Sequence, residues 1–204
     1  IASTAGKFAS CFALGARILK DFYPEFAQEI EKKADPAYEE GIKKPGVCQT
    51  ASVRSPYIYE EDNWTDDMEL AAIELYKSTQ NNRYLQQAIE YGRREPVTPW
   101  MGADSARHYQ WYPFMNMGHY WLAKTENNTR LNEEFIRNIR IGLQRTYEKA
   151  RQNPFLYGIP AIWCSNNLTT AMLTQCRLYR EVTRDSTYEE MEASLRDWLF
   201  GCNP

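Results

Sequence analysis

Aromatic rings and hydrogen-bonding side chains occur together in three stretches of this sequence, at 44–64, 95–113 and 152–165. Trp and Tyr rings offer flat apolar faces on which a sugar ring can stack, while carboxylates, amides and Arg side chains bind hydroxyl groups. This combination suits a polysaccharide cleft, and the alternative is that the rings merely pack long loops onto helix ends. The tryptophans concerned are Trp64, Trp100, Trp111 and Trp163, and the tyrosines are Tyr57, Tyr59, Tyr109, Tyr112 and Tyr157.

The most acidic stretch, EEDNWTDDMEL at 60–70, is the first place to look for general acid–base chemistry. Thr65 is predicted to be a helix N-cap, which places Asp66 and Asp67 in the first turn, where the helix dipole stabilises carboxylates. Adjacent helical residues point about 100° apart, so the two acids cannot easily flank one glycosidic bond. Helix capping therefore explains the pair, although one of the two acids can still bind a sugar hydroxyl.

Histidine, cysteine and metal chemistry have little support. The chain has two histidines and five cysteines without C-x-x-C spacing, which argues against a zinc site, and no loop has calcium-binding spacing. His108 lies in a loop and can contact a ligand, whereas His119 lies within a helix and is predicted to be a core residue. The cysteines are expected to be buried free thiols, and neither a cofactor nor a metal is assigned.

Charge and composition exclude two classes of partner. The net charge of −3 gives no basic surface for nucleic acid, and no apolar run is long enough to span a membrane. With 204 residues, of which 43% are apolar, the chain can bury a substantial core. It is expected to form one globular domain.

Apolar residues recur at helical spacing through almost the whole chain, and no convincing strand pattern is present. Phe8, Phe12, Gly15, Leu19 and Phe22 are predicted to form a buried stripe. Similar stripes begin at Phe135 and Tyr188. The predicted helices are 2–21, 24–43, 65–78, 82–94, 114–125, 129–151, 166–182 and 186–200.

A repeat organises these helices into pairs. LYKSTQNNRYLQQAIEYG begins at Leu75, LAKTENNTRLNEEFIRNI at Leu122 and LYREVTRDSTYEEMEASL at Leu178, so the copies lie 47 and then 56 residues apart. Each copy is a helix end, a polar turn and a second helix, which together form a helical hairpin. Because only the connections between hairpins are long, antiparallel packing should place all of them at one end of the bundle, where loops carry function.

Four blocks of the sequence together resemble glycoside hydrolase family 9. They are STAGKFASCFALGARILKDFYPEFA (3–27), NWTDDMELAAIELYKSTQNNRYL (63–85), WCSNNL (163–168) and WLFGCNP (198–204). The resemblance covers essentially the whole chain. It implies an all-α fold of stacked antiparallel helical hairpins that form about four of the six hairpins of an (α/α)6 toroid, as in endoglucanases and other β-1,4-glucan hydrolases.

The same resemblance implies an inverting glycosidase whose two catalytic acids lie outside this chain. In the family, an upstream Asp-Ala-Gly-Asp motif supplies the base and a downstream Glu protonates the leaving oxygen, and GADSARH (102–108) does not replace the motif. Residues 1–204 are thus expected to be one partial catalytic domain, lacking its N-terminal and C-terminal parts. Alone it should be inactive, and no catalytic residue is assigned within it.

Substrate contacts are transferred from the family one position at a time. Asp66 matches the first acid of an Asp-Glu pair near the glycone side of the cleft, and Trp163 and Asn166 match a Trp and an Asn before an inner helix. Trp111 matches a Trp that opens another inner helix, but WYPF (111–114) replaces the Trp-Asp-Asp-Lys common in cellulases, so strict cellulase specificity is not expected. The expected substrate-binding residues are Trp64, Asp66, Arg107, Trp111, Tyr112, Trp163 and Asn166.

The expected partner is a β-glucan or related oligosaccharide, met by a secreted or periplasmic bacterial enzyme. Because the segment lacks part of a closed ring, it should expose apolar helix faces, covered by the rest of its own domain or by another copy. Two alternatives remain. One is a non-catalytic helical-repeat module that binds glycan or protein, and the other is a different toroid enzyme, such as an epimerase or lyase, with histidine-based chemistry.

Overall fold

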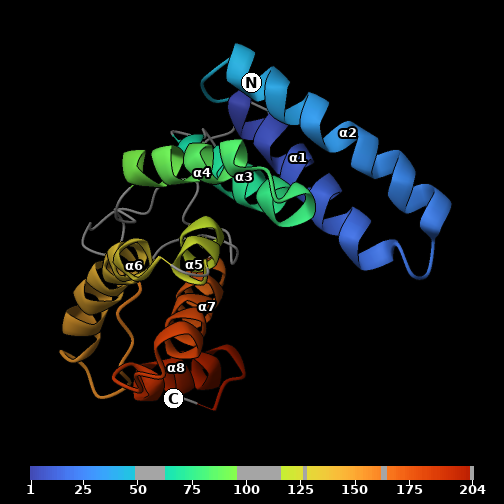
Figure 1. The fold of residues 1–204 in the computed structure, drawn as a ribbon. Coiled ribbons are helices and arrows are strands. Elements are labelled where there is room, and N and C mark those ends of the chain that lie inside the picture. Colours follow the sequence, from blue (N-terminus) through green and yellow to red (C-terminus); the bar gives the residue numbers. More distant parts are fainter. Residues whose placement is uncertain (49–62, 96–115, 126–127, 162–164, 203–204) are drawn as a thin grey trace. The chain divides into compact units, whose positions relative to one another are not determined.

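The computed structural model describes residues 1–48, 63–95, 116–125, 128–161 and 165–202. Every regular element within these ranges is an α-helix, as predicted, and the helix ends lie within three residues of their predicted positions. The chain divides into two compact units, Ile1–Glu95 and Pro96–Pro204 (Figure 1). The helices are α1 (Ala2–Leu19), α2 (Pro24–Lys43), α3 (Thr65–Thr79), α4 (Asn82–Arg94), α5 (Met117–Ala123), α6 (Thr129–Ala150), α7 (Ser165–Thr183) and α8 (Glu189–Leu199).

In the first unit, small side chains on α1 allow a close approach to α2 and α3. The buried row of α1 includes Ala5, Gly6, Ala9 and Ala13. A Cβ atom added to Gly6 would lie 2.7 Å from the carbonyl carbon of Asp67, so glycine is needed for this backbone contact. Helices α1 and α2 lie side by side as an antiparallel hairpin (Figure 1).

The apolar stripe predicted for this first helix is wrong. Phe8 is 55% exposed and Phe22 is 75% exposed, while the alanines on the opposite side are buried. The physical reason is that α1 carries apolar residues on two opposite sides, small ones on one and larger ones on the other, so helical periodicity alone does not select the packed face. The side with the small residues is the packed one, because small side chains let the backbones of α1 and α3 approach each other closely.

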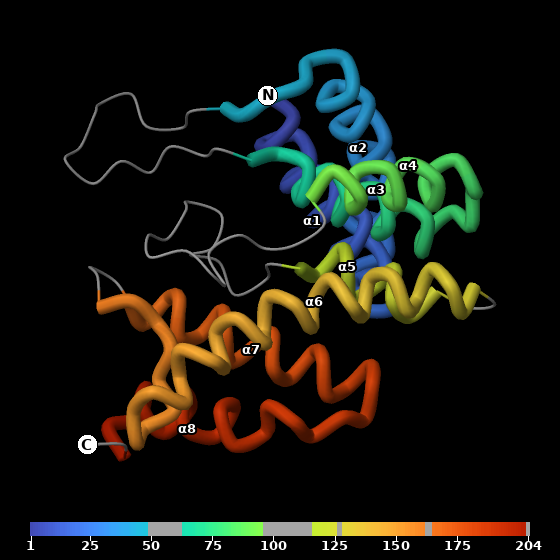
Figure 2. Tube along the Cα trace, turned by 90° about the vertical axis from the view of Figure 1, so that its left-hand side faces the viewer, coloured from blue at the N-terminus to red at the C-terminus, as the bar shows by residue number. Residues whose placement is uncertain are grey.

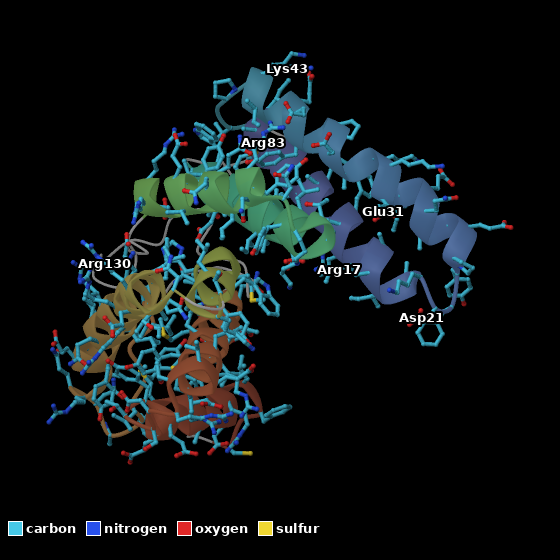
Figure 3. The ribbon with its side chains drawn as sticks, viewed as in Figure 1. Arg17, Asp21, Glu31, Lys43, Arg83 and Arg130 are labelled. Atoms are coloured by element: carbon cyan, nitrogen blue, oxygen red, sulfur yellow. The ribbon has the colours of Figure 1, made fainter. Side chains whose placement is uncertain are left out.

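The second hairpin of this unit is closed by a polar turn, as predicted. Gln80 adopts a left-handed conformation after α3. The Asn81 side chain caps the start of α4 by accepting a hydrogen bond from the backbone N–H of Arg83. Helix α4 is linked to α2 because the Tyr84 hydroxyl donates to Asp35 and the Arg83 guanidinium pairs with Glu39. Arg83 is labelled on α4 in Figure 3. The first unit is therefore two hairpins joined by packing and by polar cross-links.

The second unit has its core among α6, α7 and α8. Ile139 and Leu143 of α6 and Met191 of α8 are almost fully buried, as the predicted stripes required. The antiparallel course of α7 and α8 can be followed in Figure 2. Tyr188 lies at the start of α8 and makes edge-to-face contacts with Tyr147 and Tyr179, which joins the three helices at that point.

Candidate functional site

The beginning of α3 brings together three residues of the acidic stretch. The helix starts at Thr65 with Trp64 as its N-cap, so the prediction of Thr65 as the cap is wrong. Instead, the Asn63 Oδ1 atom accepts hydrogen bonds from the backbone N–H and the hydroxyl of Thr65, at 3.2 and 2.9 Å. The Asn63 amide also donates to Asp66 Oδ1 at 2.9 Å. One asparagine two residues before the helix therefore closes its first turn and orients the Asp66 carboxylate.

Asp66 and Asp67 both lie in the first turn, as predicted, but their surroundings differ. Asp67 is buried, and its Oδ2 atom lies 3.2 Å from the Lys7 ammonium nitrogen. Because Gly6 packs on the backbone of Asp67, this pair joins α3 to α1. Asp67 is thus held in an internal contact, as the capping interpretation implied, whereas Asp66 retains accessible surface.

The Asp66 carboxyl group has a pKa raised from 3.8 to about 6. Partial removal of this half-buried carboxylate from water is the main cause, and the nearby Glu69 charge raises the pKa further, while backbone N–H groups and Lys7 oppose the shift. A carboxyl group of this kind changes charge close to neutral pH. It can accept a hydrogen bond from a sugar hydroxyl when ionised and donate one when protonated.

Trp64 is half-buried and is held by two residues near the end of α4. Its ring meets Tyr91 edge-to-face at 5.9 Å, and the Arg94 guanidinium carbon lies 4.6 Å from its centre. Arg94 therefore occupies one face of the indole through a cation–π contact. A sugar ring has only the opposite face to stack on, so the structure supplies an anchor for Trp64 and leaves its sugar contact a prediction.

At the start of α7, Asn166 has an exposed side chain. Its backbone carbonyl accepts a hydrogen bond from the Thr170 hydroxyl at 2.9 Å, which is a contact within the helix. The amide is accordingly placed at a helix N-terminus where a ligand can reach it. The predicted contact between Asn166 and substrate stays a prediction.

Tyr157 does not belong to an open aromatic rim, contrary to prediction. Its ring stacks on Trp198 of α8 with centroids 4.1 Å apart, and its hydroxyl hydrogen-bonds the Thr169 hydroxyl at 3.0 Å. The Asn153 side chain holds the same loop, donating to the Tyr157 carbonyl at 2.7 Å. Gly158 follows, where an added Cβ would lie 2.4 Å from the Thr146 carbonyl oxygen. The loop-packing alternative is right for this tyrosine.

The structure thus brings together two of the predicted substrate-binding residues, Trp64 and Asp66, at the beginning of α3. Asn166 lies in the other unit. The remaining four, Arg107, Trp111, Tyr112 and Trp163, lie outside the described residues. Sequence reasoning missed the residues that position this site, which are Lys7, Asn63, Tyr91 and Arg94. Of these, only Asn63 carried a signal, because asparagine is common just before a helix.

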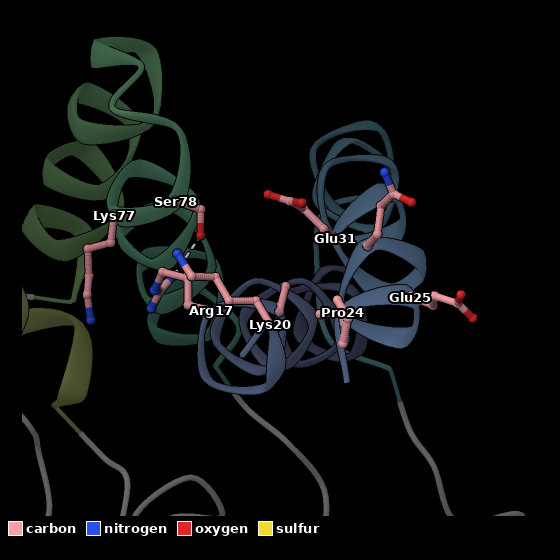
Figure 4. A pocket seen from close by; sticks show the side chains of 10 residues that line it. Arg17, Lys20, Pro24, Glu25, Glu31, Lys77 and Ser78 are labelled. Carbon is pink, nitrogen blue, oxygen red and sulfur yellow. Dashed lines mark hydrogen bonds between the residues drawn. The ribbon is translucent and has the colours of Figure 1, made fainter. Parts of the chain in front are cut away.

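A separate hollow of about 630 Å³ lies between the α1–α2 turn and the C-terminal end of α3 (Figure 4). Arg17 donates to the Ser78 hydroxyl at 2.6 Å and to the Glu74 carbonyl at 2.8 Å, and it also pairs with the buried Glu74 carboxylate. Lys77 lies 3.1 Å from the same carboxylate. Glu74 therefore neutralises cations that line this hollow. A helix of this length separates it from Asp66 by roughly 20 Å, so it belongs to another end of the unit.

Other side chains that could do chemistry are mostly in structural roles. His119 is buried against Phe135, edge-to-face at 4.9 Å, which confirms its prediction as a core residue. Burial raises the pKa of the Cys176 thiol, whereas Cys11 and Cys202 are exposed, so the expectation of buried cysteines is wrong for these two. The described part of the chain holds no group of three histidine, cysteine or acidic side chains placed to bind a metal. None of the described helices has the length and apolar character needed to cross a membrane.

Comparisons with known proteins place this geometry in context. The model of the family described as Glycosyl hydrolase family 9 matches residues 1–204. Among solved structures, a metagenome-derived glycoside hydrolase family 9 endoglucanase is similar with a TM-score of 0.74 at 18% identity, covering 98% of this chain and 36% of that one. The cellulase Cel9M of C. cellulolyticum is similar with a TM-score of 0.71 at 15% identity, covering 100% of this chain and 45% of that one. The endoglucanase of the termite Nasutitermes takasagoensis is similar with a TM-score of 0.68 at 16% identity, covering 97% of this chain and 44% of that one.

No curated protein matches the chain. The solved structures confirm the predicted fold class, an all-α arrangement of stacked hairpins that forms part of an (α/α)6 toroid. The chain spans less than half the length of each of these three structures. The family match over the whole chain confirms the resemblance drawn from the four sequence blocks.

Proposed function

Because the chain belongs to glycosyl hydrolase family 9, we propose that it forms part of the catalytic domain of a β-1,4-glucan hydrolase. The family match over residues 1–204 is the observation that carries the proposal. Similarity to structures named as endoglucanases and a cellulase supports the same substrate class. Such an enzyme would act on polysaccharide outside the cytoplasm, in a secreted or periplasmic location.

The proposed reaction is hydrolysis with inversion at the anomeric carbon. It needs one carboxylate that activates a water molecule and one carboxylic acid that protonates the leaving oxygen, on opposite sides of the scissile bond. We assign neither role to residues 1–204. The Asp67 carboxylate is buried and paired with Lys7, which leaves it unsuited to activating water. The two catalytic acids would come from other parts of the domain.

The proposed role of this chain is to bind the glucan. Asp66 would bind a sugar hydroxyl, because its carboxylate is oriented by Asn63 and retains accessible surface. Trp64 would offer the ring face opposite Arg94 to a sugar ring. Asn166 would contribute an exposed amide at the start of α7. The proposed set is completed by the substrate contacts assigned from sequence to Arg107, Trp111, Tyr112 and Trp163.

Turnover and product stereochemistry test the proposal directly. The natural gene product that carries these residues should hydrolyse cellopentaose and soluble β-glucan, and proton NMR should show the α-anomer as the first product. Chain 1–204 alone should give no turnover. A gene product that releases the β-anomer first would contradict inversion, and one that leaves both substrates intact would contradict the hydrolase assignment.

Assays of the same natural gene product also test the alternative of a non-catalytic helical module. A module would bind β-glucan without hydrolysing it, and its gene would lack both an upstream Asp-Ala-Gly-Asp motif and a downstream catalytic Glu.

The binding role of Asp66 is tested by substitution. Asp66→Asn in the active gene product should raise KM about tenfold, since a charge-assisted hydrogen bond is replaced by a neutral one. Glu190→Gln, an exposed carboxylate on α8, is the matched control and should leave KM unchanged.

A further inference from the structure

The α1–α2 hairpin extends further than the α3–α4 hairpin beside it. Arg83 and Tyr84, in the first turn of α4, bind Glu39 and Asp35, which lie in the second half of α2. Eleven residues of α2 precede Asp35, and at 1.5 Å per residue they cover roughly 16 Å. The α1–α2 turn around Asp21 therefore projects beyond the start of α4 (Figure 3).

The hollow of about 630 Å³ lies at the step between the two hairpins. Helix α1 contributes Arg17 and Lys20 to its lining, α2 contributes Gln28 and Glu31, and α3 contributes Ser78. In Figure 4 the Glu31 carboxylate points from α2 toward the side of α3 that carries Ser78, and Arg17 and Lys20 extend between them. The volume is within the range of about 300–1,000 Å³ that is typical of ligand pockets.

The charges around this hollow balance one another. Among the described residues, its lining carries the cations Arg17, Lys20 and Lys77 and the carboxylates Glu25 and Glu31. The buried Glu74 carboxylate pairs with Arg17 and Lys77 and supplies the third negative charge. A site without net charge does not select a phosphate or sulfate ion. It suits a neutral ligand that both donates and accepts hydrogen bonds.

Three polar side chains of the hollow are available to such a ligand. Within the described part of the chain, Lys20, Gln28 and Glu31 make no hydrogen bond or ion pair with another residue, and all three are exposed. Together they offer an ammonium donor, a carboxylate acceptor and an amide that both donates and accepts. Each hydroxyl group of a sugar also donates and accepts. The hollow therefore matches the hydrogen-bonding chemistry of a sugar.

Exposed aromatic rings border the hollow. Lys20 and Pro24 both line it, and they flank the turn that carries Phe22 and Tyr23. These two rings are 75% and 64% exposed, and Phe26 in the first turn of α2 is 52% exposed. Such rings offer flat apolar faces on which a sugar ring can stack. Stacking surfaces and hydrogen-bonding groups thus occur together at this end of the unit.

We propose that the hollow and the α1–α2 turn form a second binding site for a β-glucan chain, at the opposite end of α3 from Asp66. The ligand class is taken from the proposed function, on which this inference rests. Because roughly 20 Å separate the two ends of α3, a polymer can contact both, whereas a short oligosaccharide bound at Asp66 does not need the hollow. A second contact with the same polymer raises its affinity through effective concentration.

Kinetics of the natural gene product on soluble polymeric β-glucan and on cellopentaose test the second site. Lys20→Gln combined with Glu31→Gln removes both charges, and Tyr23→Ala removes a ring. Each variant should raise KM for the polymer at least threefold and leave KM for cellopentaose unchanged. Lys32→Gln, exposed on α2 outside the hollow, and Phe200→Ala, a 77% exposed ring after α8, are the controls and should change neither value. An unchanged KM for the polymer, or equal rises for both substrates, would overturn the proposal.

Binding without turnover separates this inference from the proposed function. A gene product that hydrolyses neither substrate would contradict the hydrolase assignment, yet its binding can still be measured by electrophoresis in gels that contain soluble β-glucan. The glucan should retard the wild type and both controls, and should retard the hollow variants less. Equal retardation of hollow variants and controls would overturn the second site, whatever the catalytic result.

Two further measurements exclude indirect effects. Thermal unfolding should give the hollow variants and the wild type similar melting temperatures, and Gln28→Ala, which keeps every charge, replaces the double variant where that protein does not fold. Size-exclusion chromatography should give all variants the elution volume of the wild type. A changed elution volume for the hollow variants would assign the hollow to a contact between copies of the protein and would overturn the proposal.

Discussion

The Lys7 ammonium lies 3.2 Å from the Asp67 carboxylate, so the first helix of one hairpin is bonded to the first turn of the next. This contact gives two adjacent acids different tasks. Asp67 faces α1 and is buried, while Asp66 is oriented by Asn63 and keeps accessible surface. The separation follows from helix geometry, because neighbouring residues point in different directions around the axis.

Asp67→Asn should lower the free energy of unfolding by about 1–2 kcal/mol, because it removes the buried carboxylate charge that pairs with Lys7. Lys7 is about one-third exposed, which keeps the loss below that of a fully buried pair. Urea unfolding followed by circular dichroism measures the effect. Glu190→Gln, on an exposed surface, should change stability little. An Asp67→Asn chain as stable as the wild type would show that the contact does not hold the hairpins together.

The raised pKa of Asp66 predicts a pH dependence of stability. Its folded-state pKa of about 6 exceeds the ordinary value of 3.8, so between these values the folded chain holds a proton that the unfolded chain has released. The contribution of Asp66 to stability therefore falls as pH rises through this window. The stability of Asp66→Asn relative to wild type should rise from pH 4 to pH 7. A difference that stays constant over that range would mean that Asp66 titrates normally in the folded chain.

The parts of this fold that were predictable from sequence depend on local interactions. Helix ends and the polar turns inside hairpins follow from residues close together in the chain, such as Asn81 and Arg83. The packed face of α1 was not predictable, because both of its sides are apolar. The contact of Trp64 with Arg94 and the stacking of Tyr157 on Trp198 join distant residues, and nothing in their spacing indicates them.

Gly6→Ala should destabilise the first unit, because the new Cβ would lie 2.7 Å from backbone atoms of Asp67 and force α1 away from α3. Overpacking of this kind costs about 1–3 kcal/mol. Gly15→Ala is the matched control in the same helix, since its Cβ would meet only the terminal carbon of Ile30, at 3.2 Å. That side chain can move, and alanine is favoured over glycine within a helix by about 0.5–1 kcal/mol.

The two glycine variants are compared by thermal unfolding. Gly6→Ala should melt at a lower temperature than the wild type, and Gly15→Ala at the same or a higher temperature. Equal melting temperatures for all three proteins would show that α1 and α3 can separate without loss, against the close backbone contact seen at Gly6.

Arg17→Met should destabilise the chain by about 2–3 kcal/mol, because it removes a charge partner of a buried carboxylate. Glu74 is 2% exposed, and its remaining cation, Lys77, lies 3.1 Å away, which limits the loss. Arg196→Ala breaks an exposed pair with Asp197 and should cost at most about 0.5 kcal/mol. Urea unfolding of both variants separates the buried pair from the exposed one. If the two variants lost similar free energies of unfolding, the buried Glu74 carboxylate would not need Arg17 for its stabilisation.

The contact between Arg94 and Trp64 predicts a separable effect on substrate binding. Arg94→Ala removes a cation–π contact worth about 0.5–1 kcal/mol at a partly exposed site, so stability should fall only slightly. The indole then loses an anchor, and a sugar platform on its opposite face becomes less well positioned. In the active gene product, KM for cellopentaose should rise several-fold, with a larger rise for Trp64→Ala. Arg93→Ala, at the adjacent exposed position, is the control and should leave KM unchanged. If Trp64→Ala lowers stability but leaves KM unchanged, the role of the Trp64 ring is only to pack against α4, just as the Tyr157 ring packs against Trp198 of α8.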